Sequence, residues 1–180
     1  MRIIGGTFKG RNLTSFNGDK IRPTSDMARE SLFNILRDKV VGCAFLDLFG
    51  GTGAVGIEAC SRGANKVVIV DISRESVSVA KKNLEKTGNP TGIEIKNRDA
   101  LDYLKTTDTA FDIIFIDPPY KSEIIPSVLK AIADGNALKD GGVVVTETET
   151  EYAGETFSLI KTDERKYGRA RFTFFKKEQK

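Results

Sequence analysis

LDLFGGTGAVG, residues 46–56, is the most informative part of this sequence for its fold. It begins as an apolar run and continues into three glycines, Gly51, Gly53 and Gly56, in the spacing G-x-G-x-x-G. Glycines in this spacing allow a sharp turn between a strand and a helix and bring the backbone close to a ligand, while the helix N-terminus offers unpaired N–H groups. The stretch fits any adenosine-type ligand on a doubly wound sheet.

Short apolar or β-branched runs alternate with helix-like segments from Cys43 onward, which is typical of a mainly parallel sheet with helices on both faces. The runs predicted as strands are 43–48, 66–71, 93–97, 112–117 and 142–147. Helices are predicted from the glycine loop to Gly63, from the N-cap Ser73 to Gly88, and over 123–134, where Pro126 fits only the first turn.

The C-terminal part breaks this alternation. Residues 157–161 and 170–177 flank a polar turn without room for a helix, which predicts an antiparallel pair at the sheet edge. We therefore expect an α/β fold with a doubly wound, seven-stranded, mainly parallel sheet and antiparallel C-terminal edge strands.

The N-terminal part has a different composition. MRIIGGTFKGRNL, residues 1–13, predicts a small hairpin around Gly5 and Gly6. RPTSDMARESLFNILRDKV predicts a helix capped near Thr24–Asp26, whose apolar stripe packs on the main sheet. We expect residues 1–41 to form a hairpin-helix extension and residues 42–180 the main domain, within one structural domain overall.

Composition limits the function classes. The 180 residues match one domain without a membrane-spanning run or an apolar signal core, so we expect a cytoplasmic protein. The chain contains no histidine, which excludes Ser-His-Asp and Cys-His mechanisms and most zinc sites. Cys43 and Cys60 are predicted to pack as small hydrophobic side chains, and no metal site is expected.

Charge is distributed unevenly along the chain. Residues 1–41 contain eight Lys or Arg and four Asp or Glu, and residues 161–180 contain eight and three. Residues 42–160 contain twelve and eighteen, so two basic ends surround an acidic middle. This arrangement is expected for a polyanion-binding rim around a small-molecule site, although ordinary solvated faces would give the same counts.

Three acids follow successive predicted strands. Asp71 ends the strand after the glycine loop, twenty residues beyond Gly51, where an acid binds ribose hydroxyls. Asp47 precedes the loop, a position unfavourable beside phosphates but favourable beside the cationic amino acid part of S-adenosylmethionine. Asp99 follows the third strand and is placed to accept a hydrogen bond from an adenine amino group. Each acid alone could equally be a turn or cap residue.

The stretch FIDPPYK, residues 115–121, ends the fourth predicted strand. Pro118 and Pro119 alone would be read as a strand terminator, because proline lacks an N–H donor. With Asp117 and Tyr120 beside them, the same residues offer a carboxylate, an aimed carbonyl and an aromatic face. Strand termination alone requires neither the acid nor the ring, so the rest of the chain decides how this stretch is interpreted.

Taken in order, these motifs resemble the class I S-adenosylmethionine-dependent amino-methyltransferases. MRIIGGTFKGRNL and IRPTSDMARESLFNIL, residues 21–36, further resemble the bacterial RsmD family, which methylates the exocyclic N2 of a guanine in 16S ribosomal RNA. The resemblance extends from Arg2 to the last predicted strand. It implies a Rossmann-like class I methyltransferase with S-adenosylmethionine as cofactor and ribosomal RNA as partner, either free or in an assembled or partly assembled small subunit. It implies neither a membrane nor an obligate protein partner.

The resemblance also implies site residues. Asp117 and the Pro118 carbonyl would accept hydrogen bonds from the target amine, with Tyr120 against the base, so the catalytic set is Asp117, Pro118, Pro119 and Tyr120. The methionine part, the ribose and the adenine would be held by Asp47, Phe49, Gly50, Gly51, Gly53, Asp71, Ile72, Asp99 and Ala100. The RNA-binding candidates are Arg2, Lys9, Arg11, Arg22, Thr24 and Arg29.

Other functions fit parts of the pattern. Methylation of adenine N6 or of another exocyclic amine on nucleic acid needs the same acceptors, and a protein glutamine is a further target, which the basic rim disfavours. An NAD-dependent oxidoreductase would share the glycine loop, but Asp47 and the missing histidine disfavour it. A noncatalytic RNA-binding domain would tolerate Asp117→Ala, whereas the enzyme would lose methylation and keep most of its cofactor binding.

Overall fold

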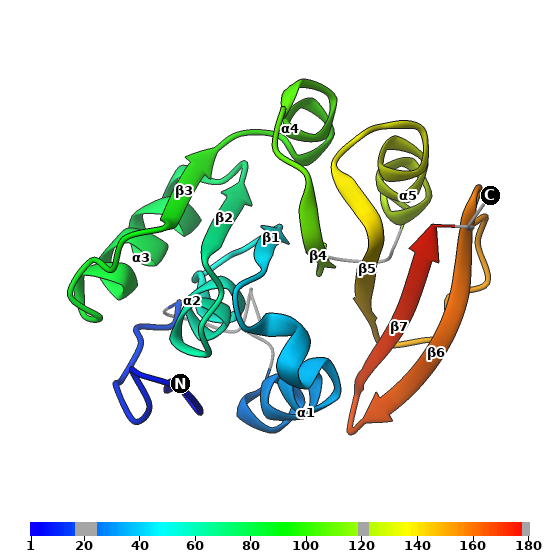
Figure 1. Ribbon diagram of the computed structural model, residues 1–180. Coiled ribbons are helices and arrows are strands. Elements are labelled where there is room, and N and C mark those ends of the chain that lie inside the picture. Colours follow the sequence, from blue (N-terminus) through cyan, green and yellow to red (C-terminus); the bar gives the residue numbers. More distant parts are fainter. Residues whose placement is uncertain (17–24, 119–122, 178–180) are drawn as a thin grey trace.

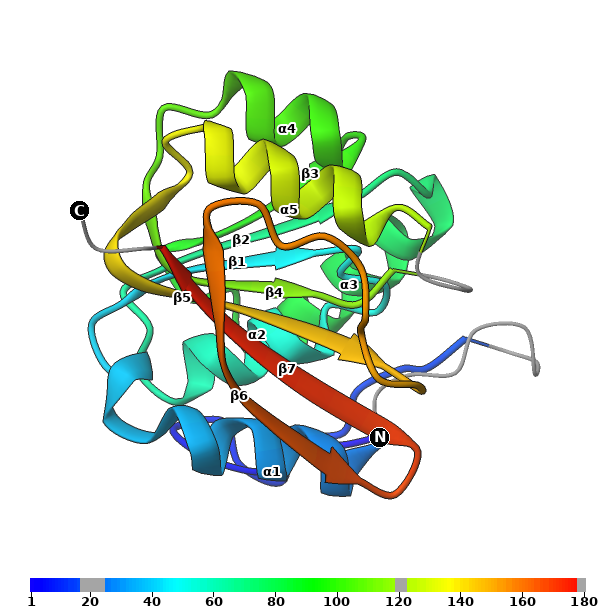
Figure 2. The same cartoon turned by 90° about the vertical axis from the view of Figure 1, so that its right-hand side faces the viewer.

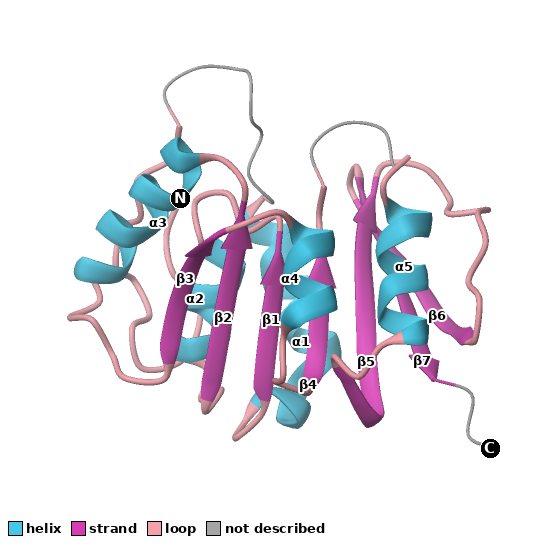
Figure 3. Cartoon of the chain, turned by 90° about the horizontal axis from the view of Figure 1, so that it is seen from above, coloured by secondary structure: helices cyan, strands magenta, loops and turns pink. Residues whose placement is uncertain are grey.

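A single sheet runs through the molecule in this computed structural model, which describes residues 1–16, 25–118 and 123–177 (Figures 1 and 3). Within these residues seven strands are ordered β3-β2-β1-β4-β5-β7-β6. Their bounds are β1 Ala44–Leu48, β2 Lys66–Asp71, β3 Ile93–Asn97, β4 Phe111–Ile116, β5 Leu138–Thr148, β6 Leu159–Tyr167 and β7 Ala170–Lys177. Strands β1 to β5 pair in parallel, and β7 is antiparallel to both β5 and β6. The predicted α/β fold is therefore confirmed.

Helices cover both faces of the sheet, as Figure 1 shows. Of the α-helices in the described residues, three lie on one face, namely α1 Asp26–Leu36, α2 Ala54–Ser61 and α3 Arg74–Glu85, and two on the other, namely α4 Ala100–Thr106 and α5 Ile125–Asp134. Two cores form because successive side chains of a strand point to opposite faces of the sheet. In β1, Phe45 belongs to the core under α1 and α2, whereas Leu46 and Leu48 belong to the core under α4 and α5. Strands covered on both faces read as continuous apolar runs, which is the pattern of the central strands here.

The helix predictions are confirmed except for one omission. The Ser73 side chain caps α3 by accepting a hydrogen bond from the Ser76 N–H (3.2 Å), and Pro126 lies in the first turn of α5. Helix α4 was not predicted, because its seven residues are too few for a clear apolar periodicity. Its start is set by Asp99, whose side chain accepts hydrogen bonds from the N–H groups of Leu101 and Asp102.

Helix α1 begins at the N-cap Ser25, whose hydroxyl accepts a hydrogen bond from the Ala28 N–H (3.1 Å). The apolar stripe packs as predicted, with Ala28, Leu32 and Leu36 buried. A short 3-10 helix, Arg37–Val40, then leads into β1.

Residues 1–13 fold back as a short, irregular hairpin, in line with the prediction. The two halves meet at an antiparallel bridge between Arg2 and Asn12, and the Ile3 N–H donates to the Arg11 carbonyl and the Leu13 N–H to the Met1 carbonyl, both at 3.0 Å. The pairing does not extend into a regular ladder because the intervening backbone is bonded to α2: the Ile4 and Gly5 N–H groups donate to the Glu58 carboxylate at 2.9 and 2.8 Å. Since Ile3 lies in the core that also contains residues of α1 and α2, this loop is packed as part of the main body.

The β6–β7 hairpin closes the sheet at the edge opposite β3 and extends past α1 (Figure 2). It packs through apolar residues, because Phe172 and Phe175 are fully buried. None of the described helices is long and apolar enough to cross a membrane.

Candidate active site

The carboxyl ends of the parallel strands bring the predicted acids together. Leu48 of β1 pairs with Val70 of β2 and with Ile116 of β4, so the chain leaves all three strands at the same level. The next residues are Phe49, Asp71 and Asp117. Ligands of open α/β sheets bind at this edge, in the crevice outside the strand ends. The register therefore places the glycine loop between the ribose candidate and the catalytic candidate.

The glycine loop is held in one conformation by hydrogen bonds. The Gly50 N–H donates to the Val70 carbonyl (3.0 Å), the Gly51 N–H to Asp71 Oδ2 (2.8 Å) and the Gly53 N–H to the Gly50 carbonyl (2.7 Å). Gly51 and Gly53 have φ of 54° and 77°, which other residues rarely adopt. A Cβ at Gly50 would lie 2.3 Å from Ile69 Cγ2 of β2, which is too close for a side chain. The loop can therefore pack this closely against β2 only with glycine at this position.

Asp47 lies beneath this loop. Its side chain is 1% exposed, and Oδ2 accepts a hydrogen bond from the Gly56 N–H of α2 (2.8 Å). Burial raises the pKa of Asp47 to about 8, and the neighbouring Asp117 and Asp71 carboxylates add to the rise. A cation bound above the loop would lower this pKa, because it would stabilise the charged form. Contact between Asp47 and the methionine part of a cofactor stays a prediction.

Asp71 and Ile72 form a second part of the edge. Asp71 accepts hydrogen bonds from the Gly51 and Ser73 N–H groups, both at 2.8 Å and each on a different oxygen. A carboxylate oxygen has two acceptor positions, so both oxygens keep capacity for hydroxyl donors. The Ile72 side chain is 68% exposed, an apolar surface beside these acceptors. This pairing suits a ribose next to a planar ring.

Asn97 holds the turn that follows β2, although it was not among the site residues predicted from the sequence. Its Nδ2 donates to the Asp71 carbonyl (3.0 Å) and to the Ile72 carbonyl (2.8 Å). Asn97 ends β3, two residues before Asp99. A side-chain amide at the end of a strand was the sequence feature that could have indicated its role. Asp99 can both cap α4 and accept a hydrogen bond from an adenine amino group, because a single oxygen, Oδ1, accepts both capping bonds. Ala100 follows as the buried first residue of α4.

The catalytic candidates are only partly within the described residues. Asp117 and Pro118 follow β4 and are half-buried. Asp117 lies near enough to Asp47 for its charge to raise the pKa of Asp47. Pro119 and Tyr120 lie outside the described residues.

The RNA-binding prediction for Arg29 is wrong. The Arg29 side chain is fully buried: Nη2 bonds to the Arg2 carbonyl and to Asp26 Oδ1 (3.0 Å), and Nε lies 3.6 Å from the Glu58 carboxylate. From its position on the helix, the Arg29 side chain could point either to solvent or into the protein. The buried Glu58 carboxylate supplies the negative charge that stabilises it inside. Arg22 and Thr24 lie outside the described residues.

Arg2, Lys9 and Arg11 are exposed on the N-terminal loop, although at different places. Lys9 lies in the turn tied to Ser61, at the end of α2 away from the glycine loop. Arg11 donates to the Lys86 carbonyl at the end of α3 (2.9 Å) and covers the Phe8 ring. Lys9 and Arg11 therefore lie beside the ends of α2 and α3, respectively.

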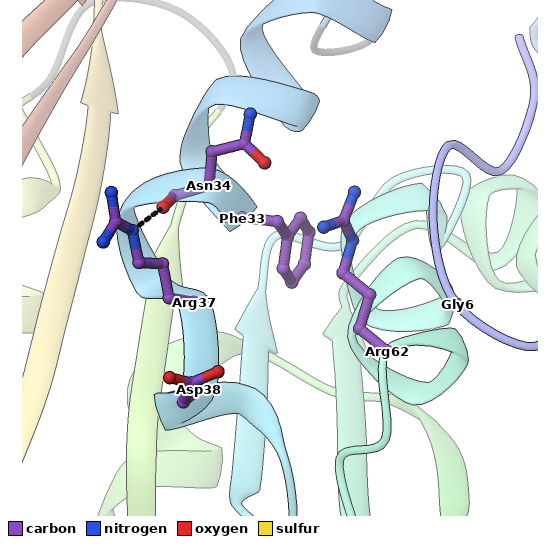
Figure 4. A pocket seen from close by; sticks show the side chains of 6 residues that line it. All are labelled: Gly6, Phe33, Asn34, Arg37, Asp38 and Arg62. Carbon is purple, nitrogen blue, oxygen red and sulfur yellow. Dashed lines mark hydrogen bonds between the residues drawn. The ribbon is translucent and has the colours of Figure 1, made fainter.

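A pocket of about 640 Å³ lies elsewhere, between α1, the C-terminal end of α2 and the N-terminal loop (Figure 4). Arg62 covers the Phe33 ring at 5.0 Å from its centroid, and Arg37 donates to the Asn34 carbonyl (3.2 Å). None of the predicted site residues lines it. Among the described residues no cluster of His, Cys, Asp or Glu could hold a metal ion.

The chain has clear relatives. The family described as Conserved hypothetical protein 95 matches residues 1–176. Ribosomal RNA small subunit methyltransferase D of Haemophilus influenzae is 33% identical over 89% of this chain and 86% of its own length. The Escherichia coli K12 protein of the same name is 35% identical over 84% of this chain and 76% of its own length.

Solved structures agree with the sequence relatives. The Escherichia coli protein yhhF superposes with a TM-score of 0.87 at 30% identity, covering 99% of this chain and 98% of that chain. A hypothetical protein of Thermus thermophilus, TTHA0928, superposes with a TM-score of 0.82 at 27% identity, covering 98% and 99%. The similarity therefore includes the N-terminal loop and the C-terminal hairpin.

Proposed function

Because this chain belongs to the RsmD family of methyltransferases, we propose that it methylates the exocyclic N2 amine of a guanine in small-subunit ribosomal RNA. The observation that carries the proposal is the shared edge at which the glycine loop, Asp71 and Asp117 leave three adjacent strands at one level. In this proposal the methyl donor would bind directly beside the acceptors for the amine. The proposed substrate puts the reaction in the cytoplasm, where ribosomal subunits form.

The residues at the edge fit S-adenosylmethionine. The glycine loop, which packs closely against β2, would hold the amino acid part. Asp71 has acceptor capacity for the ribose hydroxyls, and the exposed Ile72 offers an apolar surface for the adenine ring. Asp99 and the first turn of α4 would bind the adenine amino group and ring edge. When bound, S-adenosylmethionine supplies a methyl group activated on a sulfonium. Asp47, beneath the loop, would offset the positive charge of the amino acid part.

Asp117 and Pro118 would act on the amine. The nitrogen is a poor nucleophile because its lone pair is delocalised into the base. A carboxylate and a carbonyl that accept its two hydrogens favour a pyramidal nitrogen with its lone pair directed at the methyl group. Proline fixes the backbone and adds no competing N–H. The proton then leaves to Asp117 or to water, and no histidine is required.

Tyr120, from its place in the sequence, would stack on the flipped base and stabilise it by about 1 to 3 kcal/mol. The exposed Arg2, Lys9 and Arg11 would contact phosphates of the same RNA. Ribosomal RNA, free or in an assembling subunit, is accordingly the proposed partner.

The test is mass spectrometry of nucleosides from 16S rRNA of cells with and without the gene. We expect N2-methylguanosine to fall by one residue per 16S rRNA in the deletion strain, to return with the wild-type gene and to stay low with Asp117→Ala. The purified Asp117→Ala protein should still bind S-adenosylmethionine in a titration. An unchanged N2-methylguanosine level would contradict the proposal, and a loss of N6-methyladenosine instead would assign the enzyme to adenine.

A further inference from the structure

A buried asparagine joins three distant parts of the chain. Asn83 of α3 is fully buried, and its side chain makes three hydrogen bonds. Nδ2 donates to the Thr14 carbonyl (3.0 Å) and to the Thr52 carbonyl (2.9 Å), and Oδ1 accepts from the Thr14 N–H (2.7 Å). Thr14 belongs to the N-terminal segment and Thr52 to the glycine loop. One side chain thus fixes both to α3.

The bonds to Thr14 hold the end of the N-terminal segment, defined here as residues 1–16. Asn83 pairs with both backbone groups of Thr14, as a neighbouring strand would. Lys86 adds a bond from Nζ to Thr14 Oγ1 (2.7 Å). Two residues later the Phe16 ring lies over the glycine loop, since a Cβ built on Gly51 would lie 3.9 Å from Phe16 Cε2.

The bond to Thr52 acts on the glycine loop itself. Thr52 lies between Gly51 and Gly53, whose positive φ values mark a backbone with few intrinsic restraints. The Asn83 donor fixes the direction of the Thr52 carbonyl and therefore of the Thr52–Gly53 peptide. The Gly53 N–H of the same peptide donates to the Gly50 carbonyl, so Asn83 and Gly50 hold the two sides of this peptide, while the Gly50 and Gly51 N–H bonds act on other peptides.

We propose that Asn83 is a positioning residue that couples the N-terminal segment to the glycine loop, so that RNA and S-adenosylmethionine bind with positive cooperativity. The inference rests on the proposed function, which assigns the segment to RNA and the loop to the cofactor. RNA bound to residues 1–16 would hold Thr14 and Phe16 in place and, through Asn83, the loop. Coupling between sites is reciprocal, so bound cofactor strengthens RNA binding by the same factor.

The test is calorimetric titration with S-adenosylhomocysteine, the unreactive product, with and without small ribosomal subunits from cells lacking the gene. A 16S rRNA transcript is the second RNA probe. For the wild-type protein we expect RNA to tighten S-adenosylhomocysteine binding about fivefold or more. Asn83→Asp keeps the acceptor for the Thr14 N–H but loses both donors. We expect it to bind S-adenosylhomocysteine about fivefold more weakly and to lose the enhancement by RNA.

Two further variants make the result specific. Phe16→Ala removes the ring over Gly51 without changing a buried polar group, so it tests the coupling even where Asn83→Asp fails to fold. We expect it to reduce the enhancement by RNA at least twofold. Ser61→Ala is the matched control, because Ser61 ties the same segment to α2 through Gly5 and Phe8, at the far end of the helix. It should keep the wild-type enhancement.

The failures are distinguishable. If the wild-type protein binds neither S-adenosylhomocysteine nor any RNA probe, the proposed function is wrong and the coupling with it. If it binds both but RNA leaves the affinity for S-adenosylhomocysteine unchanged, the coupling is wrong and the proposed function stands. Wild-type enhancement in Asn83→Asp or Phe16→Ala would also overturn the role assigned to Asn83.

Discussion

At the scale of single residues, Asp47 is the least ordinary group in the candidate site. Its carboxyl group is buried beneath the loop that it helps to hold, through one bond to the Gly56 N–H. Burial is the main cause of its raised pKa, since the low-polarity surroundings disfavour the charged form. Burial also raises the pKa of both cysteine thiols, that of Cys43 to about 12, which keeps the thiols protonated and suits a packing role.

The Asp47 pKa predicts how stability depends on pH. The unfolded chain loses this proton near pH 4, whereas the folded protein keeps it up to about pH 8. The contribution of Asp47 to the free energy of unfolding is therefore fully present below pH 4 and is lost as pH rises to about 8. The slope is at most about 1.4 kcal/mol per pH unit.

Asp47→Asn removes this titration. Urea unfolding at pH 5, 6.5 and 8 should show the variant gaining stability relative to the wild type as pH increases. Cys60→Ser, remote from the edge, should follow the wild-type pH profile. Parallel profiles for Asp47→Asn and the wild type would show that Asp47 ionises normally.

At the scale of elements, Glu58 holds the N-terminal loop, α1 and α2 together. Its carboxylate is fully buried, accepts hydrogen bonds from the Ile4 and Gly5 N–H groups and from Arg62 Nε (2.8 Å), and pairs with Arg29. Two cations and two backbone donors thus share one carboxylate. This set explains why the middle of the N-terminal loop is bonded to α2 and adds no further hairpin pairs.

We expect Glu58→Gln to destabilise the protein strongly, because it removes the buried carboxylate beside Arg29 and leaves this buried guanidinium only the half-exposed Asp26 as a charged partner. Losing one partner of a buried ion pair costs about 3 to 5 kcal/mol, equivalent to a fall in melting temperature of about 10 °C or more. Thermal unfolding measures this directly. Asp134→Asn removes the exposed pair with Lys130 (2.6 Å) and should change stability by only about 0.5 kcal/mol or less. Similar small losses in both variants would contradict a central role for Glu58.

At the scale of the whole molecule, the acids gather at the strand ends while exposed cations lie on the N-terminal loop. This distribution suits a polyanion that approaches from the side of α2 and α3 and reaches the carboxyl edge. Because phosphate contacts release counterions, the binding should weaken with salt.

Each phosphate contact should add about 0.7 to the slope of log affinity for single-stranded RNA against log salt. Arg2→Ala should therefore lower the slope by about this amount without a change in S-adenosylhomocysteine affinity. Lys105 is an exposed residue of α4, on the opposite face of the sheet, so Lys105→Ala should leave the slope unchanged. Filter binding from low to physiological salt measures it, and an affinity independent of salt would exclude the phosphate rim.

Prediction from sequence succeeded where local rules govern the chain. The strands, the Ser73 cap and the position of Pro126 follow from periodicity, capping and the missing proline N–H, which act over a few residues. It failed for Arg29, because the direction of a helical arginine depends on a carboxylate twenty-nine residues away. It missed Asn83 for the same reason, since both partners of its side chain are remote in sequence.

The sequence was enough to predict the strands of a doubly wound sheet in outline, the glycine loop and the types of acid at each strand end, because apolar periodicity and glycine spacing are local properties. The folded structure was needed to show that Asp47 is buried, that Arg29 faces Glu58 and that Asn83 joins the N-terminal segment to the loop. Burial and charge pairing depend on neighbours brought together by folding, and no local pattern encodes which neighbours those will be.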